Sequence, residues 1–168
     1  MVPYPDIENL PEPLAQQLAT RRPLNVFRMV MHAPGFAPAY FSMADAVRNC
    51  SFAPALRELV ILRVGHAYNA PYELHHHEKI ARSAGLCEDA IAVAAHGGDI
   101  QRLELRERQL LMWTDSLLEQ HALRGADRES AISVLGLNGL AELVFIVGFY
   151  QQVCNFLLTF DIEVENDS

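Results

Sequence analysis

Cysteine and positive charge are both scarce in this chain of 168 residues. The three cysteines stand far apart, at Cys50, Cys87 and Cys154, which is unlike a disulfide-stabilised scaffold and suits a reducing compartment such as the cytoplasm. Lys and Arg number 13 against 21 Asp and Glu, so the formal net charge is −8. Since polyanions bind to clustered positive charge, we expect neither a nucleic acid nor an anionic membrane as partner.

Long apolar runs are also missing, although 51% of the residues are hydrophobic. The strongly apolar run at residues 143–147 falls far short of the roughly 20 apolar residues that span a bilayer. Residues 1–8 have neither a basic start nor an apolar stretch, so no signal peptide is expected. The composition excludes a disordered chain and predicts one globular domain over residues 1–168, in a soluble cytoplasmic protein.

Strand-like alternation of apolar and polar residues is absent, whereas apolar residues recur at helical spacing almost throughout. We therefore predict an all-α chain, a single compact multi-helix domain with a frayed tail over 163–168. The expected helices cover 11–20, 23–32, a segment through Tyr40, Met43 and Val47, 53–67, 72–84, 88–95, 103–120, 127–136 and 138–160.

Motifs for common cofactors and metals are missing as well. We find no phosphate loop, dinucleotide fingerprint or nucleophile elbow. Residues 73–76 contain one Glu-x-x-His step, but a four-helix di-iron site needs a second such step and two further glutamates. We therefore expect no cofactor and no metal.

The chemically distinctive segment is 58–77, which places acids and imidazoles in otherwise apolar surroundings. Glu73 and His77 are one helical turn apart and share a face, and a short return between two helices would bring Glu58 opposite them. Acids and imidazoles in an apolar environment have proton affinities shifted toward neutrality, as general acid–base chemistry requires.

Structural alternatives exist for each of these residues. Glu73 occupies the third position of its helix, where glutamate commonly caps backbone donors, and Glu58 could pair with Arg63 or another arginine. Of three consecutive histidines at most two can face the interior, and we expect His75 to be the solvated one. His66 could simply pack near its helix end.

Several motifs together resemble the carboxymuconolactone decarboxylase-like proteins, which share the alkyl hydroperoxidase D fold. The resemblance covers nearly the whole chain, with its core at about 53–95. The matching segments are Arg57-Glu58-Leu59, Tyr72-Glu73-Leu74-x-x-His77, Ala81-Arg82-x-Ala84-Gly85-Leu86, Asn25-Val26-Phe27-Arg28, His32-x-Pro34 and Phe149-Tyr150.

The resemblance implies a choice between two branches. In the peroxidase branch, redox cysteines stand at the positions held here by Ala70 and Glu73, so a dithiol mechanism cannot run at this site. The decarboxylase branch implies that His77 donates or accepts the proton, that Glu73 is its partner or the base, and that Glu58 orients them. For substrate binding we select Tyr72, His76 and His66.

Three functions follow as hypotheses. The first is a cofactor-free decarboxylase or lyase acting on a small carboxylate or lactone. Because the decarboxylase pattern has basic or imidazole residues near Ala70 and Tyr72, we expect a substrate other than the muconolactone. The alternatives are hydroperoxide reduction and non-catalytic binding. The resemblance also implies a homo-oligomer, a dimer, trimer or hexamer, in agreement with the apolar residues on several faces of the last helix.

Overall fold

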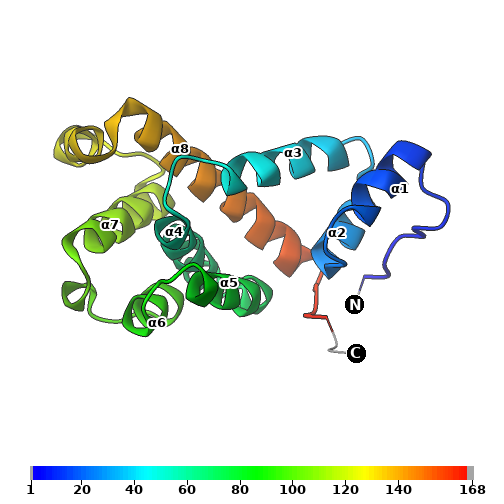
Figure 1. The fold of residues 1–168 in the computed structure, drawn as a ribbon, viewed down its shortest axis with the longest axis horizontal. Coiled ribbons are helices and arrows are strands. Elements are labelled where there is room, and N and C mark those ends of the chain that lie inside the picture. The colour runs from blue at the N-terminus through cyan, green and yellow to red at the C-terminus, as the bar shows by residue number, and fades with distance from the viewer. Residues whose placement is uncertain (1, 166–168) are drawn as a thin grey trace.

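The computed structural model describes residues 2–165, and within that range it contains helices and no strand. The all-α prediction is therefore confirmed. The helices, shown in Figure 1, are α1 (Glu12–Ala19), α2 (Asn25–Val30), α3 (Ala37–Arg48), α4 (Pro54–Ala67), α5 (Pro71–Ser83), α6 (Glu88–His96), the 3₁₀ helix η1 (Ile100–Arg102), α7 (Leu105–Gln120) and α8 (Gly125–Thr159).

Proline and glycine set several of these boundaries. A proline stands in the first turn of α3, α4 and α5, where it loses no helical hydrogen bond. After α5, Gly85 adopts a φ of 85°, and the N–H of Leu86 bonds to the carbonyl of Ala81 at 3.0 Å. This is the glycine C-cap that the sequence predicts.

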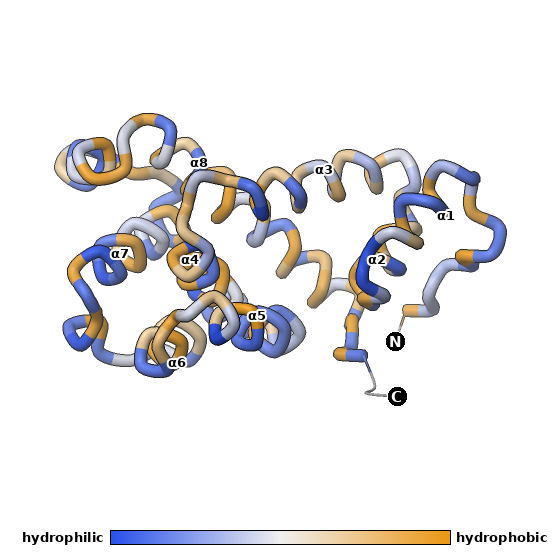
Figure 2. The backbone as a smooth tube through the Cα atoms, viewed as in Figure 1, coloured by the Kyte–Doolittle hydropathy of each residue, from blue (hydrophilic) through white to orange (hydrophobic). Residues whose placement is uncertain are grey.

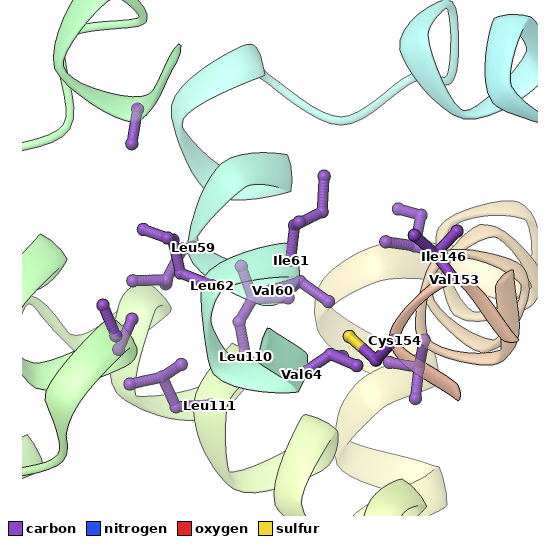
Figure 3. Packing of buried hydrophobic residues seen from close by; sticks show 14 of the residues in the cluster. Leu59, Val60, Ile61, Leu62, Val64, Leu110, Leu111, Ile146, Val153 and Cys154 are labelled. Carbon is purple, nitrogen blue, oxygen red and sulfur yellow. The ribbon is translucent and has the colours of Figure 1, made fainter. Parts of the chain in front are cut away.

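Helix α4 is the centre of the main core, with seven buried residues. It packs against α5, α6, α7 and α8. Figure 3 shows Leu59 and Leu62 on one side of α4, while Ile61 and Val64 point toward Ile146, Val153 and Cys154 of α8. A helix buried on nearly every side explains why α4 lacks a polar face.

Helix α8 is longer and more continuous than the sequence predicts. With 35 residues it is long and apolar enough to cross a membrane by length and composition, although the longest uninterrupted apolar run suggested no such segment. The same test is passed by core helices of soluble proteins, and α8 runs along the core here, between the α4–α7 group and α1–α3 (Figure 1). At Gly136 the backbone leaves helical geometry, with φ 70° and ψ 174°, so two predicted helices are joined across a kink.

Helices α1–α3 form an arm with a small core of its own. Five buried residues make up this core, namely Leu14, Val30, Met31, Ala37 and Phe41. Arg21, after α1, also forms an ion pair with Asp45 of α3 at 2.6 Å. The arm lies along α8, and the chain returns to α2 after α8 ends (Figure 1).

The predicted frayed tail, residues 163–168, is partly held in place. Glu163 and Glu165 both contact Asn25 of α2, so residues 163–165 pack against the fold although they are not helical. Residues 166–168 lie outside the described residues.

Two leucines of α7 test the position of the core. Leu110 is fully buried, whereas Leu105 is 62% exposed. We predict that Leu110→Ala lowers the free energy of unfolding by about 2–5 kcal/mol, because it leaves a cavity. Leu105→Ala should change it by about 0.5 kcal/mol or less. Urea unfolding measures both, and equal losses would contradict this packing.

Candidate active site

A cavity of about 590 Å³ lies where the arm, α4, α5 and α8 meet. Its wall combines aromatic residues with Glu58, Glu73 and His77, and four arginines line it as well, namely Arg21, Arg22, Arg48 and Arg57. A concave site with a few convergent polar groups is typical of small-molecule binding.

The turn after α4 brings the distant parts of the site together. Asn69 has a φ of 50°, and α5 folds back along α4, so that Glu58 near the start of α4 meets His77 beyond the middle of α5. The two helices approach closely at Gly65, where a Cβ atom would lie 3.1 Å from Leu74 Cδ2 and 3.4 Å from Glu73 Cγ. Helix α5 packs against α4 and is the more hydrophilic of the two along its length (Figure 2).

His77 lies between two buried carboxylates. Its Nδ1 is 2.6 Å from Glu58 Oε2, and its Nε2 is 3.0 Å from Glu73 Oε1. The second contact is not aligned as a hydrogen bond, so Glu58 holds the ring more firmly than Glu73 does. Arg57 Nε donates to the other oxygen of Glu58 at 3.1 Å, and the ring of Tyr150 packs edge-on against His77 at 5.2 Å.

Burial and neighbouring charges shift the proton affinities of these groups. Burial raises the pKa of Glu73, the charge of His77 opposes that shift, and the charge of Glu58 adds to it. Burial by itself would lower the pKa of His77, but Glu73 and Glu58 together outweigh burial and the net shift is upward. A proton is thus favoured on this cluster near neutral pH, as an acid–base site requires.

The structural alternatives are settled by these contacts. No side chain caps α5, so Glu73 faces His77 instead of the helix N-terminus. Glu58 does pair with another arginine, Arg57, and it also contacts His77, while Arg63 binds Asp115 at 2.6 Å.

The other histidines of this region lie in three different environments. His75 is exposed, as predicted. His76 lines the cavity with Tyr72. His66 does not line it and lies beside Gly97 instead, 3.2 Å from where a Cβ would stand. The structure therefore gives no support for the selection of His66, because the end of α4 turns away from the cavity.

Several cavity residues were not selected from the sequence. Tyr40 and Tyr150 line the wall, and burial raises the pKa of both hydroxyls. Tyr150 and Arg57 stood inside matching motifs, which was a usable signal. Glu165 lies outside the lining but contacts two residues of the wall, Tyr72 and His76. No sequence signal pointed to it, because it lies in a polar segment beyond the last helix.

The cysteines do not line this cavity. Cys87 is exposed and Cys50 partly exposed. Cys154 is buried, and burial followed by the charge of Glu73 raises the pKa of its thiol. A thiol of raised pKa is a poor source of thiolate.

Solved structures share the fold of this chain. The chain is similar to the alkylhydroperoxidase AhpD core of an uncharacterized peroxidase-related protein from Ralstonia eutropha JMP134, with a TM-score of 0.82, 21% identity and coverage of 98% of this chain and 92% of that one. It is also similar to an uncharacterized peroxidase-related protein from Silicibacter sp. TM1040, with a TM-score of 0.84, 15% identity and coverage of 99% of this chain and 91% of that one. A third similar structure is a protein of unknown function from Agrobacterium tumefaciens, with a TM-score of 0.73, 17% identity and coverage of 82% of this chain and 96% of that one. The protein thus has an AhpD-like fold.

The family comparison agrees with the resemblance found in the sequence motifs. Residues 34–115 match the carboxymuconolactone decarboxylase family model, which confirms the resemblance predicted from the motifs around Glu58 and His77. No curated protein sequence matches the chain.

The charge of His77 can be titrated directly. We predict by nuclear magnetic resonance a His77 pKa above 6.5, and a lower pKa in Glu73→Gln, because one of the two carboxylates that favour the imidazolium is removed. The control is Glu78→Gln on the same helix, since Glu78 contacts His96 and Arg82 instead. A His77 pKa that is unchanged in Glu73→Gln would contradict the electrostatic account.

Proposed function

We propose that the protein is a cofactor-free acid–base enzyme of decarboxylase or lyase type, acting on a small carboxylate or lactone. The observation that supports this most directly is the imidazole of His77, 2.6 Å and 3.0 Å from two buried carboxylates in the wall of a cavity. Enzymes use such buried acid–imidazole groups to move protons near neutral pH.

The proposed reaction breaks the bond between a carboxylate group and a carbon conjugated to a carbonyl. Carbon dioxide leaves, and the electron pair moves into the conjugated system as an enolate. The His77 imidazolium then donates a proton to carbon, and the neutral imidazole regains a proton from solvent. Positive charge in the cavity wall stabilises the developing oxyanion.

The roles of the carboxylates follow from their geometry. Glu58 has a short, aligned contact with Nδ1 and a second partner in Arg57, so we assign it the orientation of the ring. Glu73 is closer to neutrality because burial raises its pKa, and its contact with Nε2 is poorly aligned. We therefore assign the exchange of the proton with the ligand to the Nε2 and Glu73 side.

The arginines of the wall support an acidic ligand. Arg21 is paired with Asp45 and Arg57 with Glu58, whereas Arg22 and Arg48 add positive charge to the same cavity. A local excess of positive charge attracts a small anion even though the chain as a whole is negative. We also propose a cytoplasmic homo-oligomer, since Leu137, Val144 and Phe145 expose apolar surface on α8.

Hydroperoxide reduction is the second candidate, because the names of two similar structures describe peroxidase-related proteins. The raised pKa of the buried Cys154 thiol argues against it. Replacing all three cysteines with serine separates the two functions, since a cysteine-dependent peroxidase would lose its activity and the acid–base enzyme would not.

His77 provides the main test of the proposed function. A panel of small carboxylates and lactones is screened for turnover, and His77→Gln should lower kcat by about 100-fold or more, as expected when a general acid–base group is removed. His75→Gln is the matched control, because His75 is exposed on the same helix. Circular dichroism shows whether each variant is folded.

Each outcome has a defined meaning. A folded His77→Gln protein with full turnover would refute the acid–base assignment. Normal function in the cell after replacement of Glu58, Glu73 and His77 would favour the non-catalytic binding protein.

A further inference from the structure

The carboxylate of Glu165 lies among donors from two helices. Its Oε1 accepts hydrogen bonds from Tyr72 Oη at 2.7 Å and from the backbone N–H of Asn25. Its Oε2 lies 2.9 Å from His76 Nε2, a close contact that is not aligned as a hydrogen bond, and only 25% of the side chain is exposed. The hydrogen bonds from Tyr72 and Asn25 outweigh burial and lower the pKa of Glu165, so the group is an ionised carboxylate near neutral pH.

The donors are positioned independently of the carboxylate that they bind. Tyr72 and His76 stand one turn apart on α5, with ring centroids 4.5 Å apart. The hydroxyl of Tyr72 is also 3.4 Å from the backbone N of Val26, which links α5 to α2. Glu165 arrives from another part of the chain, beyond the end of α8.

The donors also border the main cavity. Tyr72 and His76 line it together with Glu73 and His77 of the same helix, whereas Glu165 is outside the lining. The position of the Glu165 carboxylate is therefore connected to the proposed reaction site, because Tyr72 and His76 border both.

The segment that carries Glu165 is attached mainly by polar contacts. Ile162 is the last buried apolar residue, at 7% exposure, and Val164 beyond it is only half-buried. The other polar contact is between Asn25 Nδ2 and the carbonyl of Glu163 at 3.0 Å. Val164 packs partly buried against the main core, so the segment beyond Ile162 is attached by one apolar side chain and by the polar contacts of Glu163 and Glu165.

We propose that Asn25 N–H, Tyr72 and His76 form a carboxylate-binding subsite, that Glu165 fills it as an internal ligand, and that the carboxylate of a small acidic ligand replaces Glu165 there. This proposal deepens the proposed function by saying where the acidic group of the ligand binds. It rests on the proposed function only where it concerns the natural substrate. The subsite binds carboxylates whether or not His77 transfers a proton.

The test uses Glu165→Ala with acetate as the probe, observed through the ring resonances of His76. Acetate should shift these resonances saturably in the variant. In the wild-type protein it should bind about tenfold more weakly or worse, because the tethered carboxylate competes at high effective concentration. Acetamide, which has the same shape without the charge, should cause no saturable shift in either protein.

Two further variants make the test specific. Glu163→Ala is the matched control, since Glu163 contacts Asn25 only through its backbone carbonyl and should behave as wild type. In the Glu165→Ala background, Tyr72→Phe should weaken acetate about tenfold or more, because it removes a hydrogen bond to a charged group. If Glu165→Ala does not fold, Glu165→Gln removes the charge and keeps the shape.

The proposal is overturned if acetate binds Glu165→Ala no better than wild type, if acetamide binds equally well, or if Tyr72→Phe has no effect. The outcome is separable from that of the proposed function. Acetate binding at His76 in a protein whose turnover survives His77→Gln would keep the subsite and reject the acid–base role of His77.

Discussion

Two buried carboxylates on either side of one imidazole are the constraint on which the arrangement of this molecule depends. An ionised glutamate without a partner in the interior costs several kcal/mol, and α4 and α5 together bury two glutamate side chains, Glu58 at 2% and Glu73 at 3% exposure. His77 and Arg57 supply the compensating charge. The approach of the two helices at Gly65, the turn at Asn69 and the packing of Tyr150 all maintain this group of charges. Stability and chemistry thus rest on the same contacts.

Much of the fold could be predicted from the sequence, because its helices carry local signals. Prolines in first turns, the Gly85 cap and apolar residues at helical spacing act within a few residues of each boundary. The pairing of Glu73 with His77 was predictable for the same reason, since both stand on one face of one helix. That Glu58 lies opposite them required only a short return between adjacent helices.

The rest of the site depends on contacts between distant parts of the chain. Arg21 and Tyr40 reach the cavity from the arm, and Tyr150 reaches it from α8, and no local pattern encodes how these elements close over α4 and α5. Glu165 is the clearest case, because a polar residue beyond the last helix is normally solvated. The membrane-length character of α8 was also missed, since the helix continues through polar and glycine interruptions that break every apolar run. His66 was selected because it is a histidine in the distinctive segment. It lies near the end of α4, outside the lining of the cavity.

The arm has a consequence for how such proteins can diverge. Residues 21–27 contribute to the cavity wall but lie outside the segment that matches the family model, residues 34–115. Part of the arm packs in a small core of its own, whereas Val26, Met29 and Val47 of α2 and α3 belong to the main core around α4. The arm therefore carries its part of the cavity wall on the same packed core that holds α4 and α5. A change in these shared core residues would move the wall and the proposed acid–base group together.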